Sequence, residues 1–295
     1  MDSFSQPIMG DGAVRWRRIA LGGLSALLMT LATSGLARAA AGDTPPAPAA
    51  AANTSATSAP AATADTHATS APTASAGHTG LQPFQASYAW QWHGATVALS
   101  TVTLTHQDGD TWVYSSSSEP RGIGRLYPMH PTQRSVLRVT ATGVEPQSYR
   151  ASAGTSSTSR DANVTFDWAH EHASGVYDDV KVDMPIKPGV QDDLSVQIAM
   201  MVQLLAGQTP TGISVIDKNT VRAYSYTREG TATIDTPFGP VQTVIYASHH
   251  AGSPRVTRFW CDPSRNYLPM RVQQKRIDSV EWTMDIQSAK IDASP

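Results

Sequence analysis

The sequence contains one cysteine, Cys261, among its 295 residues. A single thiol cannot form an internal disulfide bond, so the fold must be held together by its hydrophobic core. The small residues Ala37 and Ala39 are not followed by a cysteine either, which excludes the lipid attachment of a bacterial lipoprotein. The scarcity of cysteine therefore argues against both a disulfide-stapled domain and a lipid-anchored one.

The chain also lacks an excess of basic charge. Lysine and arginine number 22, aspartate and glutamate number 24, and the formal net charge is −2. Proteins that bind nucleic acid need a basic face, and an anionic membrane surface attracts clusters of basic residues. The composition therefore argues against nucleic acid and against an anionic membrane surface as partners.

Recognisable catalytic and metal-binding motifs are missing as well. The sequence has no Gly-x-Ser-x-Gly nucleophile elbow and no glycine-rich phosphate loop. Histidine clusters at residues 170–172 and 249–250 have neither a helical i, i+4 spacing nor a cysteine pair, so a zinc site is not indicated. We expect no catalytic residue set, no metal and no cofactor. A hydrolase that uses scattered serine, histidine and aspartate residues is the enzyme alternative.

Two pairs of neighbouring carboxylates, Asp178-Asp179 and Asp192-Asp193, have plainer explanations than acid–base catalysis. Adjacent strand residues point to opposite faces of a sheet, which separates the first pair. The second pair stands where a helix is predicted to begin, and the helix dipole favours negative charge there. We therefore interpret both pairs as structural.

The first 39 residues have the order of a secretory signal peptide. A basic cluster at Arg15, Arg17 and Arg18 precedes residues 19–36, which contain no charged side chain. Small residues at the end of this segment predict cleavage after Ala39 and release into the periplasm. The alternative is a retained segment that tethers the protein to the inner membrane, because 18 uncharged residues approach the length that spans a bilayer. Cleavage would leave no stable membrane span.

Residues 40–80 are nearly all alanine, threonine, serine, proline and glycine. Such a segment buries too little apolar surface to offset the entropy of ordering it, so we predict a disordered linker. The rest of the chain, residues 81–295, is long enough for a single β-rich domain with a sizeable core.

Short segments with alternating side chains fill most of this domain. In residues 86–92, for example, Tyr88, Trp90 and Trp92 share one face of a half-buried strand. Such segments between regular turns are typical of an antiparallel barrel or a strongly curled sheet. The predicted strands are residues 86–92, 95–106, 111–118, 135–140, 147–153, 163–168, 175–182, 213–217, 220–227, 230–235, 241–248, 255–260, 268–276 and 280–289. We predict a mainly β fold, an antiparallel curled sheet or partly open barrel.

One helix is predicted within this sheet, at about residues 192–206. Asp192 is a good N-cap, and Gly207 supplies a terminator. Apolar residues between Leu194 and Leu205 recur at three- and four-residue steps and cover more than one stripe. We expect this helix to be buried on two sides and to pack into the concave side of the sheet.

Several motifs follow one another in a characteristic order. They are Gly143–Tyr149, Phe166-Asp167, Gln191–Ser195, Thr236–Thr243 and Leu268–Val272. This order resembles the bacterial family called domain of unknown function 3108, over nearly all of residues 81–290. The resemblance implies an exported protein without an assigned activity. It also implies a curled sheet with an inner helix, similar to the lipoprotein carriers LolA and LolB, but no catalytic residue set, since a fold does not fix a function.

Aromatic and methionine side chains supply the candidate binding site. A curled sheet with a large apolar interior is able to hold a lipid-like ligand. The predicted ligand-binding residues are Trp90, Trp92, Trp112, Trp260 and Met201. The alternative is an ordinary packed core that the methionine-rich helix fills.

Together these features predict an exported, non-enzymatic protein of the periplasm. Its expected partner is a lipid-like ligand or an envelope protein, bound at the concave face of the sheet or at its rim. A structural or interaction module of the cell envelope is the second interpretation, and a hydrolase without a recognisable motif is the third.

Overall fold

The computed structural model describes residues 80–127 and 129–292. The predicted signal peptide, residues 1–39, and residues 40–79 of the predicted linker lie outside the described residues. In the described part of the chain, no helix has the length and apolar character needed to cross a membrane.

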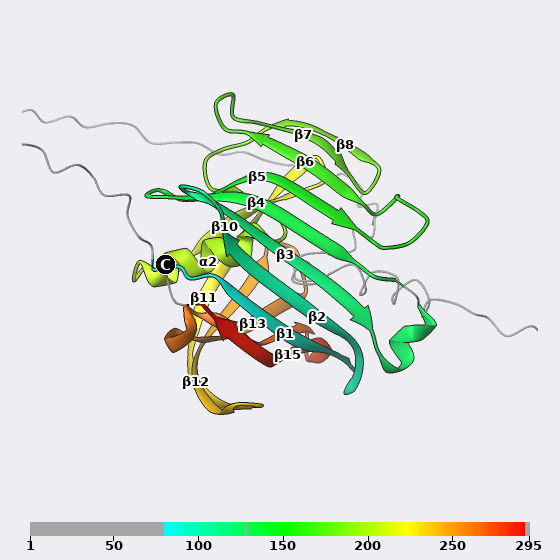
Figure 1. Cartoon of the computed structure of the whole chain (residues 1–295), viewed down its shortest axis with the longest axis vertical. Helices are drawn as coiled ribbons and strands as arrows, with labels where there is room; N and C mark the ends of the chain where they lie inside the picture. Colours follow the sequence, from blue (N-terminus) through cyan, green and yellow to red (C-terminus); the bar gives the residue numbers. More distant parts are fainter. Residues whose placement is uncertain (1–79, 128, 293–295) are drawn as a thin grey trace, which may run out of the picture. The chain divides into compact units, whose positions relative to one another are not determined.

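One mixed sheet of fifteen strands makes up most of the described residues (Figure 1). The strands are β1 (Phe84–Trp92), β2 (Ala95–His106), β3 (Thr111–Pro120), β4 (Thr132–Thr140), β5 (Gly143–Ser152), β6 (Ala162–Asp167), β7 (His172–Tyr177), β8 (Val180–Pro185), β9 (Val190–Gln191), β10 (Gly212–Asp217), β11 (Thr220–Thr236), β12 (Gly239–His250), β13 (Arg255–Asp262), β14 (Leu268–Arg276) and β15 (Ser279–Ile291). The helix α2 (Ser195–Leu205) and the short 3₁₀ helices η2 (Gly122–Leu126) and η3 (Pro263–Arg265) accompany them. The predicted mainly β class with one buried helix is confirmed.

The order of the strands explains why the sheet curls. Strands that follow one another in sequence pair with each other, except that β8 does not pair with β9. In addition β1 pairs with β15, so β8 and β9 form the two edges of the sheet. A flat sheet of fifteen strands would be roughly 67 Å wide, at about 4.8 Å per strand. Residues 186–189 alone join the two edges, so Pro185 and Val190 lie at most about 18 Å apart. The sheet must therefore curl back toward itself, although its edges do not pair and it stays open.

Two details differ from the predicted antiparallel order. The two-residue strand β9 pairs with β10 in parallel, through Val190 with Ser214 and Gln191 with Val215. The predicted strand at residues 175–182 is in fact two strands, β7 and β8, joined at Asp178-Asp179. Both aspartates have a positive φ, 51° and 59°, which two-residue hairpin turns of type I′ require. Aspartate tolerates this backbone conformation, so the pair turns the chain instead of extending a strand.

The opposite error concerns the predicted strands at residues 220–227 and 230–235. They form one continuous strand, β11, whose pairing with β12 shifts register between Arg228 and Gly230. Gly230 has a φ of 132°, which a residue with a side chain rarely adopts. A bulge in one strand, rather than a turn between two, accounts for this glycine.

The helix α2 begins three residues later than predicted, but Asp192 does cap it. The carboxylate Oδ1 of Asp192 accepts hydrogen bonds from the backbone N–H groups of Leu194 and Ser195, each at 2.8 Å. In return the Asp192 N–H donates to Ser195 Oγ at 2.8 Å. This reciprocal arrangement satisfies backbone groups that the first turn of a helix leaves without partners.

The concave side of the sheet is packed around α2. Nine of its eleven residues are buried, and it contacts β5 and β9. Met200 and Met201 lie among the largest fully buried side chains, together with strand residues such as Tyr88, Tyr114 and Phe259. All five belong to one buried cluster. The interior formed by the described residues is therefore a packed core.

Candidate functional site

Two of the predicted ligand-binding tryptophans, Trp90 on β1 and Trp112 on β3, are core residues. Trp90 is 3% exposed, and its indole Nε1 donates to Ser100 Oγ at 2.7 Å. Its ring centre lies 4.9 Å from that of Trp282. Trp112 is also buried, with His106 against it at a ring distance of 4.7 Å. Both side chains are already occupied by contacts with other parts of the protein.

The other three predicted residues differ from one another in burial. Met201 is fully buried in α2, and Trp92 packs at the margin of the core. Trp260 is half-buried and does not belong to the core cluster of the described residues, although its neighbours Phe259 and Cys261 do. The five residues do not line a common pocket among those the structure describes. Their role in ligand binding stays a prediction.

The two histidines of the cluster at residues 170–172 pair with different carboxylates, and Cys261 is buried. His170 pairs with Asp167 (Nδ1 to Oδ2, 2.8 Å), whereas His172 pairs with Asp183 (Nε2 to Oδ1, 3.1 Å). Within residues 80–127 and 129–292, no three His, Cys, Asp or Glu side chains are grouped so as to hold a metal ion. Cys261 is fully buried, and burial raises the pKa of its thiol well above the usual value. A buried, protonated thiol is a poor nucleophile.

A cluster of buried polar side chains lies at the start of α2. Asp192 and Asp193 are 0% and 4% exposed. Ser135 on β4 donates from Oγ to Asp192 Oδ2 at 2.6 Å. Asp193 Oδ2 accepts hydrogen bonds from the hydroxyls of Tyr149 on β5, at 3.4 Å, and Tyr177 on β7. These bonds tie the helix start to three strands, and we call the five residues the acid cluster.

Burial dominates the titration of both carboxyls in the acid cluster. It raises the pKa of Asp192 to about 6, even though Ser135, Ser195 and the backbone donate to the charged form. It raises the pKa of Asp193 to about 8, a rise that the hydrogen bond from Tyr177 opposes and the charge of Asp217 adds to. At pH 7 the carboxyl of Asp193 is therefore largely protonated.

The space beside the acid cluster is too small for a substrate. A pocket formed in part by Tyr177, Asp193, Arg222 and Tyr224 has a volume of about 10 Å³. That volume is close to what a single water molecule needs. Perturbed carboxyls often mark catalytic sites, but without room for a reactant these residues are better explained as a structural link between helix and sheet.

Sequence reasoning identified the cap formed by Asp192 but not the partners of Asp193. The capping interpretation accounts for the bonds of Asp192 to Leu194 and Ser195, which lie two and three positions away, but not for its bond from Ser135, which lies 57 positions away. The partners of the second, Tyr149 and Tyr177, lie 44 and 16 residues away in sequence. The available signal was a second acid just before a helix that contains no charged residue.

A second polar surface lies on the outer face of strands β2 to β7, away from α2. There the structure forms an open depression of about 860 Å³, which we call the outer trough. Strand register places six of its lining residues in one row across the sheet: Thr103, Ser115, Arg134, Arg150, Asn163 and Val176. Serine and threonine line most of the remainder, with Asp161 and Asp179. The trough is far larger than the pocket beside the acid cluster, and side chains of both charges line it.

Three solved structures share the course of this backbone in part. A β-barrel-like protein of domain of unknown function DUF1849 from Brucella abortus has a TM-score of 0.49 at 10% identity, covering 72% of this chain and 99% of that one. A protein of Bacteroides fragilis, provisionally described as exported and having a YmcC-like fold, has a TM-score of 0.35 at 10% identity, covering 71% and 96%. A protein of Parabacteroides distasonis, provisionally described as a lipoprotein, has a TM-score of 0.31 at 8% identity, covering 71% and 96%.

No curated protein is significantly similar to this chain in sequence. Residues 84–284, however, match the profile of a family described as protein of unknown function, DUF3108. The match spans all the strands from β1 to β14 and part of β15. It confirms the resemblance carried by the motifs between Gly143 and Val272, and the chain therefore belongs to the DUF3108 family.

Proposed function

We propose that this chain is an exported, non-enzymatic binding protein of the cell envelope, and that its binding surface is the outer trough. The supporting observation is where the described residues leave space. Large side chains and α2 fill the concave face, whereas about 860 Å³ of open volume lies on the outer face. Ligand pockets usually measure about 300–1,000 Å³, so the trough is large enough for a small ligand.

The concave face is the less favourable place for a ligand. Trp90, Trp112 and Met201 are packed against other core residues, so an apolar ligand there would have to displace them. Each Å² of apolar surface exposed in that process costs about 25 cal/mol. The outer trough requires no such opening of the core.

The proposal predicts a bound molecule that depends on the trough. Native mass spectrometry of the chain purified from its own envelope is expected to show an added mass, and Thr132→Trp is expected to remove it. Thr132 is exposed and lines the trough, so an indole at this position obstructs part of the space, and tryptophan is well tolerated in strands. The control is Thr233→Trp, at an exposed position of β11, which should keep the added mass.

Two results would count against trough binding. One is an added mass that survives Thr132→Trp, and the other is a chain that carries no added mass in any form. Uptake of a fluorescent fatty acid by the wild-type chain, unaffected by Thr132→Trp, would place the binding surface in the apolar interior instead.

Export predicts a particular mature N-terminus. Protein taken from the envelope is expected to begin at Ala40, because the small residues at positions 37 and 39 fit signal peptidase. N-terminal sequencing measures this directly. A chain that retains residues 19–36 would instead be tethered to the inner membrane, with residues 40–80 as the spacer.

A further inference from the structure

We propose that Arg134 and Arg150 bind the phosphate group of a phosphorylated sugar in the outer trough. This inference rests on the proposed function, since it names the ligand class of the same surface. It follows from the pairing of these two arginines, from their lack of carboxylate partners and from the chemistry of the residues around them.

The strand register holds the two arginines face to face. Arg134 on β4 is the direct partner of Arg150 on β5. Directly opposed residues of antiparallel strands have Cβ atoms about 4.5–5.5 Å apart, and like charges on such a pair of residues destabilise the sheet. Both side chains are exposed and line the trough. An anion bound between them would remove this repulsion.

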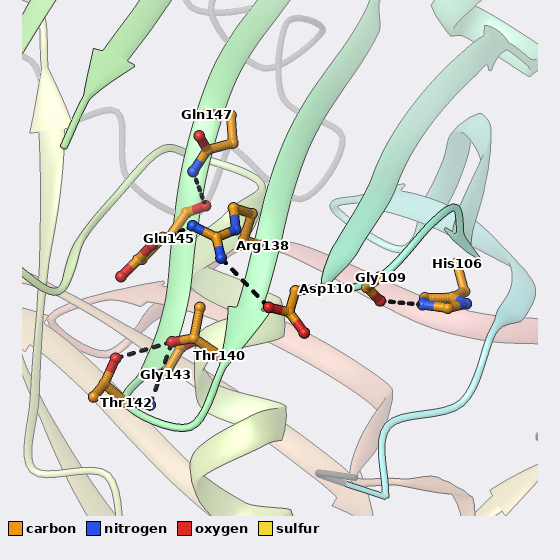
Figure 2. A network of polar contacts seen from close by, with 9 residues as sticks. All are labelled: His106, Gly109, Asp110, Arg138, Thr140, Thr142, Gly143, Glu145 and Gln147. Carbon is orange, nitrogen blue, oxygen red and sulfur yellow. Dashed lines mark hydrogen bonds and ion pairs between the residues drawn. The ribbon is translucent and has the colours of Figure 1, made fainter. Parts of the chain in front are cut away.

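No carboxylate of the described residues pairs with either arginine. Arg138, four residues further along β4, differs in this respect. Its guanidinium nitrogens lie 3.4 Å from Asp110 Oδ2 and 3.8 Å from Glu145 Oε2 (Figure 2). Five strand arginines have a carboxylate within ion-pair distance, namely Arg138, Arg222, Arg255, Arg258 and Arg271. Four other strand arginines of the described residues, Arg134, Arg150, Arg228 and Arg276, have no such partner. Of these four, only Arg134 and Arg150 are directly opposed to each other in the strand register.

A phosphate group suits this pair better than other anions do. Each guanidinium presents a planar fork of N–H donors, which matches phosphate oxygens in a bidentate manner. Two opposed forks can therefore bind a group that carries several oxygens and up to two negative charges. In the same row, Ser115 precedes Arg134 and Asn163 follows Arg150, so both ends offer further hydrogen-bond donors.

The rest of the trough indicates a sugar. A second row of side chains, Thr101, Ser117, Thr132 and Ser152, runs parallel to the first and offers only hydroxyl groups. Asp161 and Asp179 also line the trough, although the Asp161 carboxylate already accepts hydrogen bonds from the Ala153 N–H and from Ser152 Oγ. Carboxylates can accept hydrogen bonds from sugar hydroxyls but repel an extended polyanion. Among the described residues that line the trough, only Ala151, Ala162 and Val176 are apolar.

The test is a titration of the purified full chain with D-glucose 6-phosphate, D-glucose and inorganic phosphate, followed by two-dimensional ¹H–¹⁵N NMR. D-glucose 6-phosphate is expected to bind at least tenfold more tightly than either D-glucose or phosphate. Shifts are expected at Ser115 and Asn163. Arg134→Gln and Arg150→Gln should each weaken binding by about 10- to 100-fold, the usual effect of losing a hydrogen bond to a charged group. The ion-paired Arg138→Gln should leave it unchanged.

Several outcomes would overturn the inference. Equal affinity for D-glucose and D-glucose 6-phosphate would show that the phosphate group does not contribute to binding. Equal affinity for inorganic phosphate and D-glucose 6-phosphate would show that the sugar does not contribute. If Arg138→Gln lowers the affinity as much as Arg134→Gln does, the effect comes from the overall charge of the protein and not from the arginine pair. Binding to phosphatidylglycerol vesicles in place of D-glucose 6-phosphate would assign the surface to a membrane.

The stability of a charge-reversal variant separates a binding role from a structural one. Arg150→Glu places opposite charges face to face, so the unliganded protein should keep its Tm or gain about 1–3 °C. The same variant should lose its affinity for D-glucose 6-phosphate. A fall in Tm would assign Arg150 a structural role and overturn the inference.

The failure of this inference is distinguishable from failure of the proposed function. An envelope-derived mass that Thr132→Trp removes but that D-glucose 6-phosphate does not displace would overturn the sugar phosphate and leave trough binding intact. The absence of any such mass, together with no response to D-glucose 6-phosphate, would overturn both.

Discussion

Acidifying the solution from pH 8 to pH 5 is expected to stabilise the folded protein by about 2–4 kcal/mol, the opposite of ordinary acid denaturation. The group responsible is Asp193, which lies buried beneath the hydroxyls of Tyr149 and Tyr177. Burial raises the pKa of its carboxyl from the ordinary value of 3.8 to about 8. The folded chain therefore retains a proton that the unfolded chain releases.

The direction of the effect follows from where that proton is bound. The contribution of Asp193 is complete below pH 3.8 and declines as the pH rises toward 8, because only the unfolded chain gains from ionising. Asp192 acts in the same direction, since burial raises its pKa to about 6. Asp167 and Asp183 act oppositely, because hydrogen bonds from His170 and Lys181 lower their pKa. Their contribution is lost only below pH 3.8, outside the measured range.

Urea denaturation of wild type and Asp193→Asn at pH 5, 6, 7 and 8 measures this dependence. Asparagine carries no charge at any of these values, and its Oδ1 can still accept the hydrogen bond of Tyr177. The variant should show a flatter pH profile than wild type and exceed its stability at pH 8. The exposed Asp183→Asn is the control and should keep the wild-type slope. A wild type that loses stability on acidification to pH 5 would contradict the assignment.

The parts of the fold that sequence predicts well are those in which each strand has one wet and one buried face. In β4, Ser135 and Leu137 point inward while Arg134 and Arg138 point outward. Such alternation predicts a strand from its own sequence, without knowledge of the neighbouring strands. The helix was predicted equally well, because its cap and the spacing of its apolar residues are local features of the sequence. Its exact start was not, since Asp192 caps it from three residues ahead.

The parts that sequence misses depend on pairing or on distant partners. The turn at Asp178-Asp179 contains no glycine, so its residues read as a strand. The parallel pairing of β9 has no periodicity to detect in two residues. The apposition of Arg134 and Arg150 requires the register of β4 against β5, which shifts between Val136 and Leu137. The predicted binding role of the tryptophans stays a prediction, because aromatic side chains of this kind fill a core as readily as they line a pocket.

Replacing Asp192 by alanine is expected to destabilise the protein by about 2–4 kcal/mol at pH 5, which combines the loss of a helix cap with an unsatisfied buried hydroxyl. The carboxyl group of Asp192 accepts hydrogen bonds from the N–H groups of Leu194 and Ser195 and from Ser135 Oγ, and no water replaces it easily at a fully buried position. At pH 8 the loss should be smaller, because alanine also removes a buried negative charge whose pKa burial raises to about 6.

Asp192→Asn separates the cap from the charge. The amide oxygen of asparagine can accept both backbone N–H groups, and its amide nitrogen can donate to Ser135, so most of the stability at pH 5 should be retained. Circular dichroism during urea denaturation at pH 5 and pH 8 measures both variants. If Asp192→Ala and Asp192→Asn lose the same amount at pH 5, the cap does not stabilise α2. If alanine costs less than about 1 kcal/mol there, the link between the helix start and β4 contributes little, since a lost cap alone typically costs that much.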